Sequence, residues 1–251
     1  MDIPTRVAAA QLAGLRRVRH VVEAPPFVAL LATSGPDLLS YAVVAHPGQP
    51  VREVASALPV LRTAFGRTRL RFELVAEASP GAVETLLAAG LVLTRQYPLL
   101  AARASEVELP KSADHVTVSV VGTREEATQA REIAAVAFGQ AIESDEGPPV
   151  PTEGGTVLAR VGGEPVAVAS WTPVADGVTE IVGVATLPGF RRRGIGALVT
   201  AHTVHAAATL AGVTLPWLTP GDSGADRVYR RIGFSPVATA VHLADPEISR
   251  R

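Results

Sequence analysis

Cysteine, long apolar runs and an excess of charge of either sign are all missing from this chain. Without cysteine it can form no disulfide and offers no thiolate nucleophile or thiolate metal site. No segment reaches the ~18 uncharged apolar residues of a membrane-spanning helix, and the N-terminus lacks the order of a signal peptide. The net charge of −1 offers no basic face to nucleic acid. We therefore expect a cytoplasmic protein, monomeric or homodimeric, that binds neither membranes nor nucleic acid.

The residues that are present suit packed domains. The 251 residues are 47% hydrophobic, with a mean hydropathy of +0.26, which is enough for one large domain or two ordinary ones. A short polar stretch at 104–114, which contains Pro110, is typical of a linker. The chain is therefore predicted to divide at this stretch.

One stretch, residues 179–197, combines a strand, a turn and the start of a helix. Its apolar, partly β-branched residues 181–185 indicate a buried strand, which Pro188 and Gly189 interrupt. Three arginines at 191–193 then precede a run with apolar residues at helical spacing. Small residues at a helix start leave backbone N–H groups uncovered, and the helix dipole adds positive potential. The stretch is therefore a candidate phosphate-binding site.

Other interpretations of the glycines in this stretch are weaker. A dinucleotide-binding loop needs a third small residue where this chain has Val199, and a Walker loop needs Gly-Lys-Ser/Thr, which is absent. A solvated basic turn before an ordinary helix would have the same local pattern. A second motif is therefore needed to choose between these interpretations.

That second motif lies at residues 222–234. The run Arg-x-x-Gly-x-Gly at 191–196, after Val-Ala-Thr-x-Pro, resembles the acyl-CoA signature of the GCN5-related N-acetyltransferases (GNAT). Residues 222–234 resemble the family's Asn-x-x-Ala-x-x-x-Tyr-x-x-x-Gly-Phe, with Asp222 where asparagine is usual. The resemblance covers roughly residues 115–245. It implies an α/β (α+β) fold, in which a mixed, mostly antiparallel sheet is flanked by helices.

The pattern after residue 115 agrees with that order of elements. Thr123 is a candidate N-cap, because Glu125 and Glu126 follow in the first helical turn. Prolines and glycines at 143–155 indicate a loop. The predicted elements are strands 115–121, 156–161, 165–173, 214–219 and 235–243, besides the signature strand, and helices 124–138 and 224–232, besides the signature helix.

The first hundred residues repeat the same plan incompletely. Strands are predicted at 27–32, 38–44, 70–75 and 91–101, with helices at 51–65 and 80–89. After Val44 the chain reads His-Pro-Gly-Gln-Pro, without paired glycines or an arginine run. We therefore predict a degenerate GNAT-like domain without a CoA cradle at 1–103, as in tandem members of the family, a linker at 104–114 and a catalytic domain at 115–251. An unrelated α/β cap is the alternative for the first domain.

The resemblance implies a site for acetyl-CoA, the acyl-donor substrate, and no metal. The strand residues would run alongside the pantetheine arm past a bulge, with the N–H of Val184 facing the developing oxyanion. Backbone amides after the turn would hold the pyrophosphate. The residues expected to bind acetyl-CoA are Val184, Ala185, Thr186, Arg191, Arg192, Arg193, Gly194, Ile195, Gly196, Ala197, Asp222 and Tyr229.

Two side chains are candidates for acid–base catalysis. Tyr229 occupies the position of the family's tyrosine, and a phenol is a suitable proton donor to a thiolate. Glu180 precedes the signature strand's apolar run, and strand alternation predicts its side chain on one face with Val182 and Val184. The base is Glu180, a water or no residue. His202 falls on the apolar stripe of the signature helix, which favours packing over catalysis.

The acceptor is not identified by these patterns. Acidic residues in the 143–155 loop would suit a cationic amine or simply keep the loop solvated, and Trp171 and Trp217 would line an acceptor site or fill the core. The resemblance implies an N-acetyltransferase that moves an acetyl group to a primary amine of a small molecule, or to a protein amine, by direct attack. A catalytically silent acyl-CoA-binding sensor is the alternative.

Overall fold

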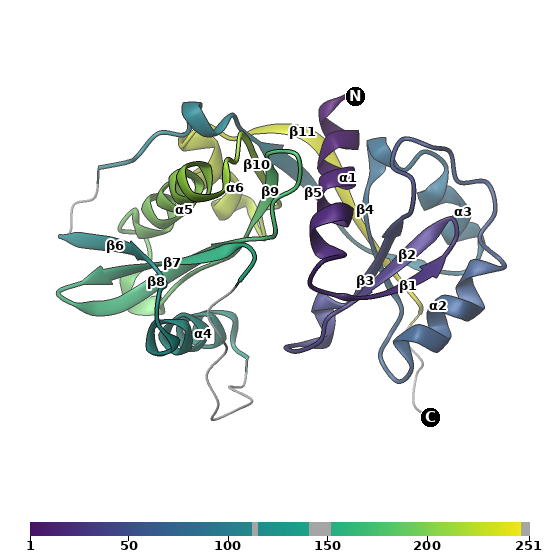
Figure 1. Ribbon diagram of the computed structural model, residues 1–251, viewed down its shortest axis with the longest axis horizontal. Coiled ribbons are helices and arrows are strands. Elements are labelled where there is room, and N and C mark those ends of the chain that lie inside the picture. Colours follow the sequence, from purple (N-terminus) through teal and green to yellow (C-terminus); the bar gives the residue numbers. More distant parts are fainter. Residues whose placement is uncertain (112–114, 141–151, 247–251) are drawn as a thin grey trace. The chain divides into compact units, whose positions relative to one another are not determined.

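The computed structural model describes residues 1–111, 115–140 and 152–246, which form two compact units (Figure 1). The first unit combines Met1–Leu99 with Pro236–Arg251, and the second comprises Leu100–Ser235. Most of the loop predicted at 143–155 lies outside the described residues. The two units are described separately below.

The second unit contains a mixed sheet with strand order β10-β9-β8-β7-β6. Strand β10 runs parallel to β9, and the other neighbours are antiparallel, so the predicted fold class is confirmed. Its elements are η3 (Ala104–Glu106), β6 (Val116–Val120), α4 (Arg124–Phe138), β7 (Gly155–Val161), β8 (Glu164–Trp171), β9 (Val178–Thr186), η4 (Pro188–Phe190), α5 (Ile195–Ala211), β10 (Leu215–Leu218) and α6 (Ser223–Arg231).

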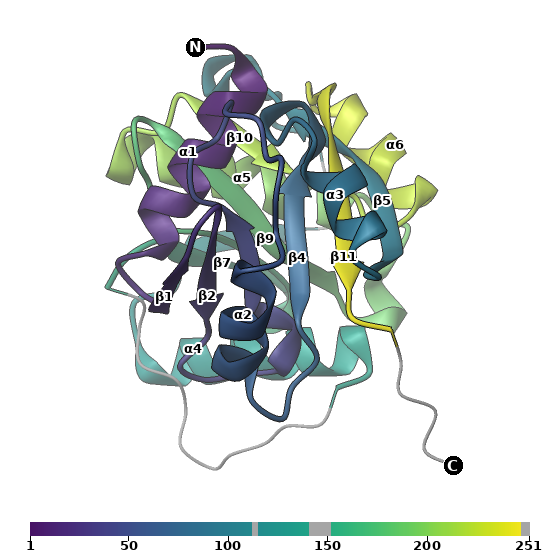
Figure 2. The same ribbon diagram turned by 90° about the vertical axis from the view of Figure 1, so that its right-hand side faces the viewer.

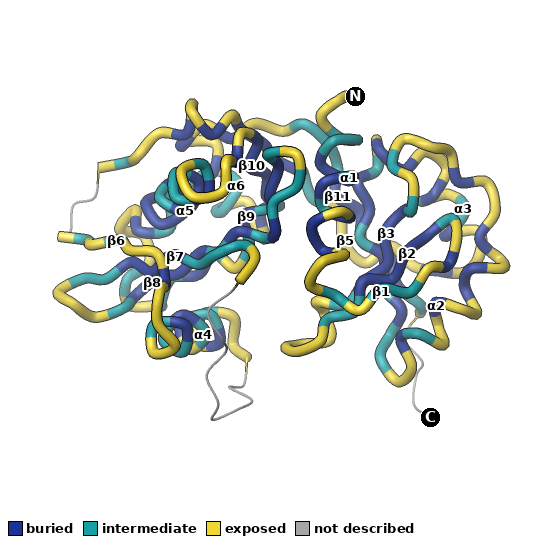
Figure 3. Tube along the Cα trace, in the orientation of Figure 1, coloured by how far each residue is buried: buried dark blue, intermediate teal, exposed yellow. Residues whose placement is uncertain are grey.

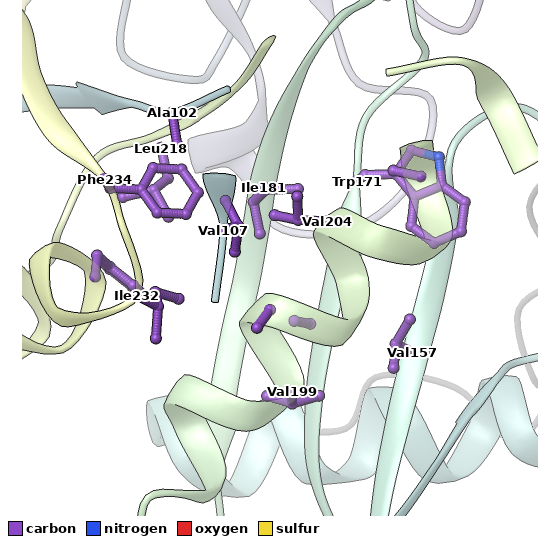
Figure 4. Packing of buried hydrophobic residues seen from close by; sticks show 14 of the residues in the cluster. Ala102, Val107, Val157, Trp171, Ile181, Val199, Val204, Leu218, Ile232 and Phe234 are labelled. Carbon is purple, nitrogen blue, oxygen red and sulfur yellow. The ribbon is translucent and has the colours of Figure 1, made fainter. Parts of the chain in front are cut away.

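Helices α4 and α5 cover opposite faces of this sheet (Figure 1). Helix α4 starts at the predicted residue because Thr123 and Glu126 form a capping box, and it ends at Gly139 in the left-handed conformation. Val199 and Val204 of α5 pack with Ile181 of β9 in the larger hydrophobic core (Figure 4). Most residues of β7, β8 and β9 are buried or half-buried, whereas the edge strand β6 is largely exposed (Figure 3).

Trp171 fills the core at one end of this sheet. It opposes Gly155 across the β7–β8 ladder, and its indole lies over that glycine. A Cβ atom at Gly155 would come within 2.1 Å of the ring, so no larger residue fits there without displacing it. Of the two roles open to Trp171, the structure shows packing in the core.

The first unit has strand order β1-β2-β3-β4-β11-β5. Helices α2 and α3 pack on one face of this sheet, and α1 packs on the other against β2 and β3 (Figure 2). Its elements are α1 (Ile3–Leu15), β1 (His20–Ala24), β2 (Phe27–Leu31), η1 (Asp37–Leu39), β3 (Tyr41–Val44), α2 (Ala57–Phe65), β4 (Arg71–Val75), η2 (Ala76–Ala78), α3 (Ala82–Ala88), β5 (Val92–Ala101) and β11 (Ser235–Ala244).

Three features of the first unit differ from the sequence prediction. Helix α1 and strand β1 were not predicted, although Asp2 caps α1 by accepting from Thr5 N. Helix α2 begins at Ala57 instead of residue 51, because residues before it bond elsewhere: Val51 N donates to Pro80 O. Strand β3 begins at Tyr41 because the preceding residues form the 3-10 turn η1.

The last strand also lies in a different unit from the one expected. Strand β11, predicted within a domain at 115–251, pairs antiparallel with β4 from Ala240↔Val75 to Ala244↔Arg71. Conversely, the end of β5 pairs with β10 in the second unit, through Leu100. The observed division therefore differs from boundaries at 103 and 115. Alternating apolar residues predict a strand but carry no information about its partner.

Part of the predicted linker is packed structure. Ala104 N donates to Thr214 O at 3.0 Å, and Glu108 N donates to Ile232 O at 3.1 Å. Val107 is buried, and its carbonyl accepts from His205 Nε2 at 2.8 Å. Residues 104–108 therefore belong to the second unit.

Candidate active site

A bulge interrupts β9 in the middle of the candidate site. Ser170 pairs with Val182 and Val168 with Ala185, so three steps along β9 match two along β8. Gly183 has a φ of 63°, a left-handed conformation that glycine adopts at bulges without steric penalty. The extra residue therefore lies at Gly183, in the strand that the sequence singled out.

The bulge changes which side chains share a face. Ile181 and Val184 both pack into the core under α5, whereas Ala185 packs against α4. In a regular strand Ile181 and Ala185 would point the same way. The predicted common face for Glu180, Val182 and Val184 is therefore wrong. Glu180, next to Ile181 in the chain, points to the face opposite α5.

Strands β9 and β10 separate just after Glu180. They pair in parallel at Val178↔Leu215, Thr179↔Pro216 and Glu180↔Trp217, and no further pair follows among the described residues. Residues 181–186 of β9 pair only with β8. One edge of β9 is therefore available between Glu180 and the turn that leads to α5.

That edge leads to a helix start without a side-chain cap. Gly194, the N-cap of α5, has a φ of 80° and supplies no cap hydrogen bond. Arg192 is one of two non-glycine residues with positive φ in the described part, at 63°. Alternating left-handed residues turn successive N–H groups toward one concavity, an arrangement that binds anions. Residues 191–194 are all exposed.

A Cβ atom fits at Gly196, in the first turn of α5. A Cβ atom built on Gly196 would meet only Thr186 Oγ1, at 3.7 Å, which is an ordinary contact. Nothing in the described chain therefore requires glycine at this position. A group that approaches the backbone closely, such as a phosphate, would require it.

The three arginines differ in what they contact. Arg191 donates through Nε to Thr186 O and through Nη2 to Ala137 O, both at 3.0 Å. Its guanidinium therefore ties the turn to the last turn of α4, where a cation also suits the helix dipole. Arg193 lies over the Phe190 ring, 5.2 Å from the centroid. The sequence did not indicate this tether.

Tyr229, the tyrosine of the second motif, lies in the core of the second unit. It is 8% exposed and packs near Phe234, with ring centroids 6.3 Å apart. Burial, followed by the charge of Asp222, raises the pKa of Tyr229 to about 12, so the phenol stays protonated at neutral pH. Its hydroxyl makes no hydrogen bond within the described residues.

Asp222 has a structural function that its side-chain chemistry explains. It is the N-cap of α6, and Oδ1 accepts from Ala225 N at 2.7 Å. Aspartate and asparagine cap helices about equally well, so the aspartate at this motif position preserves the cap. Any contact of Asp222 with CoA stays a prediction.

The other candidate side chains come from β9, β10 and α5. Glu180 is half-buried, with its backbone N–H bonded to Thr172 Oγ1 at 3.1 Å. Trp217, which pairs with Glu180 from the neighbouring strand β10, is buried. His202 on α5 has its pKa lowered by burial and then by His205, in keeping with the predicted packing role.

Two further findings concern metals and membranes. Among the described residues, no group of three histidine, aspartate or glutamate side chains is placed to bind a metal ion. No helix in the described part is both long and apolar enough to cross a membrane.

A bulged central strand that separates from its parallel neighbour and leads into an uncapped helix start defines the GNAT class of fold. A family model described as the acetyltransferase (GNAT) family matches residues 127–234. A GCN5-related N-acetyltransferase from Kribbella flavida is 46% identical, with a TM-score of 0.87 over 100% of this chain and 98% of that one. The chain belongs to the GCN5-related N-acetyltransferase family.

More distant structures share the fold. A putative GNAT-family acetyltransferase from Novosphingobium aromaticivorans is 22% identical over 98% of this chain and 100% of its own, with a TM-score of 0.61. A tandem GNAT protein from the clavulanic acid biosynthesis pathway is 13% identical over 89% of this chain and 79% of its own, with a TM-score of 0.59. No curated protein matches the chain.

Proposed function

We propose that this chain transfers an acetyl group from acetyl-CoA to a primary amine, by direct attack of the amine on the thioester. The opening between β9 and β10 carries this proposal, because it runs from Glu180 to the uncapped start of α5. A thioester that lies along the free edge of β9 would have its pyrophosphate at Gly194 and Gly196. Family membership supports the same assignment.

The chain's own groups suit each requirement of the reaction. The amine nitrogen forms a bond to the carbonyl carbon, and the C–S bond then breaks. A backbone N–H of the bulged segment, that of Val184, would stabilise the oxyanion. Tyr229 would give its proton to the leaving thiolate, since burial keeps this phenol protonated. The ammonium proton would pass to Glu180, directly or through a water.

The orientation of Glu180 suits a base that acts from the acceptor side. Its side chain points to the face opposite α5, whereas the cradle is built from α5 itself. An amine bound beside that part of β9 would have the carboxylate within its surroundings. We prefer a small-molecule amine as the acceptor; a protein amine is the alternative that the experiment below also examines.

We expect release of free CoA when the protein is given acetyl-CoA and a suitable amine. Because the chain has no cysteine, a thiol reagent reports only the CoA product. The panel comprises polyamines, aminoglycosides, free amino acids and lysine peptides, with acetyl-CoA alone as the control. Tight acetyl-CoA binding without thiol release from any amine would contradict the proposal and favour a sensor.

We further propose that the first unit is a degenerate GNAT half without a donor site. Strand β3 pairs with β2 in unbroken register from Phe27↔Val44 to Leu30↔Tyr41, without a bulge. The carboxylate of Glu53 accepts from the N–H groups of Ala55 and Ser56 at the start of α2. The next two N–H groups, of Ala57 and Leu58, donate to Val54 O, and Pro59 has none, so the amides at this helix start have partners within the chain.

A calorimetric titration of the full chain is expected to give one CoA site per chain. Removal of the first 103 residues is not a suitable test, because it would take away Leu100, which pairs with Leu218 of β10, and leave β11 without β4. The Gly196→Trp variant is the better control. Two sites in the natural chain, one of which survives in Gly196→Trp, would show that the first unit binds CoA after all.

A further inference from the structure

The first unit carries a row of ionisable side chains on one face of its sheet. Phe72 and Leu74 point into the core under α2 and α3, so Glu73 between them points to the other face. His242 on β11 is paired with Glu73 in register. None of these residues belongs to the candidate active site, which lies in the second unit.

The side chains of this row are in contact with one another. His242 Nδ1 lies 3.8 Å from Glu73 Oε1, and the ring of Tyr97 on β5 meets the His242 ring edge to face, with centroids 5.9 Å apart. Arg95 Nη1 donates to Tyr97 Oη at 2.7 Å. The Tyr97 oxygen thus accepts from Arg95, and its own proton is available for a further partner.

Positive charge dominates around this row. The charges of Arg19 and Arg71 act on Glu73, and that of Arg95 acts on His242. The Arg71 side chain makes no hydrogen bond or ion pair within the described residues. The Arg19 side chain donates to Leu39 O. Two guanidinium groups therefore act on the one carboxyl group of the row and a third acts on its imidazole, so hydrogen-bond donors predominate.

Protonation would strengthen this excess of donors. Burial raises the pKa of Glu73 to about 7, against the opposing charges of Arg19 and Arg71, although 29% of its side chain is exposed. At neutral pH the carboxyl group is therefore protonated in a large share of molecules. Burial, followed by the charge of Arg95, lowers the pKa of His242.

We propose that this face of the first unit binds a small anion, a carboxylate or a phosphate group, over β11 between Arg71 and Arg95. His242 and Tyr97 would supply further hydrogen bonds. Strand β11 lies between β4 and β5, so donors surround the site from three strands. A guanidinium group is the side chain best matched to a carboxylate or a phosphate.

The pH dependence of binding follows from the groups that face the anion. A bound anion favours the protonated forms of Glu73 and His242, so binding takes up protons. Arg19, Arg71 and Arg95 stay charged throughout this range. Affinity for succinate should therefore rise as the pH falls from 8 to 6, by about tenfold for each pH unit over which binding takes up one full proton.

The test uses the full chain and observes His242 directly. Inorganic phosphate in one series and succinate in another are titrated at pH 6, 7 and 8, while the His242 imidazole signals are followed by NMR. Their assignment comes from a His242→Gln spectrum. Because the readout is local, phosphate bound at the α5 cradle does not contribute to it.

We expect saturable shifts that Arg71→Gln weakens about tenfold or more and Arg67→Gln leaves unchanged. Arg67 is an exposed arginine of the same unit, in the turn after α2, and is the matched control. If circular dichroism shows that the Arg71→Gln variant does not fold, the Arg95→Gln variant is used in its place. A response to succinate alone assigns the site to carboxylates, and a response to phosphate alone assigns it to phosphates.

Three results would overturn the proposal: no shift with either anion, equal affinity in the natural chain and the arginine variants, or affinity for succinate that rises with pH. None of them would affect the proposed transferase activity, because its residues lie in the other unit.

Discussion

Replacing Gly196 with tryptophan is expected to abolish acetyl-CoA binding and to leave the fold intact. A Cβ atom at this position meets only Thr186 Oγ1 at 3.7 Å, so the chain itself tolerates a side chain. An indole there would fill the space above the uncapped amides of α5, which the pyrophosphate needs. We expect affinity to fall about 100-fold or more, which corresponds to roughly 2.7 kcal/mol, as measured by calorimetry.

Gly122→Trp is the matched control for this substitution. Gly122 is likewise a glycine at a helix start in the second unit; it is exposed, and a Cβ atom there would meet Glu126 Oε2 at 4.0 Å. Its replacement should leave acetyl-CoA affinity unchanged, and both variants should retain the circular dichroism of the natural chain. If the folded Gly196→Trp protein bound acetyl-CoA normally, the donor site would have to lie elsewhere.

Tyr229→Phe is expected to lower kcat about 10²-fold, the loss expected for a single general acid. The thiolate would then have to leave unprotonated or take a proton from water. The hydroxyl makes no hydrogen bond within the described residues, and phenylalanine fits the same place beside Phe234. The KM for acetyl-CoA and the thermal midpoint should therefore change little.

The separation of kcat from KM distinguishes an acid from a packing residue. A tyrosine that only filled the core would change stability or affinity on substitution, and turnover in proportion. The kcat of the natural protein should show no loss from Tyr229 ionisation up to about pH 11, since burial raises the pKa of this phenol to about 12. Full turnover in Tyr229→Phe would remove the residue from the mechanism.

The tether made by Arg191 links the turn before α5 to the other side of the sheet. Its two hydrogen bonds join the end of β9 to the last turn of α4, so this turn also anchors that helix. The motif position was predicted to bind CoA. In the structure the guanidinium of Arg191 binds two backbone carbonyls, which positions the amides of the turn.

Local patterns were enough to predict the parts of the site that are contiguous in sequence. The strand, the turn with its prolines and glycines, and the start of α5 lie within 20 residues, and each is set by backbone preferences that neighbours determine. Helix α4 was predicted with its cap because the capping box is a four-residue pattern. Family membership followed from two such local motifs.

The bulge at Gly183 shows where local prediction stops. A glycine within a strand indicates a bulge only as one of several alternatives, and the count of residues opposite it depends on β8. That single extra residue moved Val184 to the face of Ile181 and left Glu180 on the other. The face of the sheet to which the Glu180 side chain points is therefore set by strand pairing.

Partners distant in the sequence were decided by the tertiary structure alone. Strand β11 was predicted as a strand but pairs with β4, from the other half of the chain. The sequence by itself determined the family and most element types in the second unit, because these depend on neighbouring residues. Strand partners, side-chain faces and the row at Glu73 and His242 depend on contacts between residues up to 173 positions apart, which only the folded chain brings together.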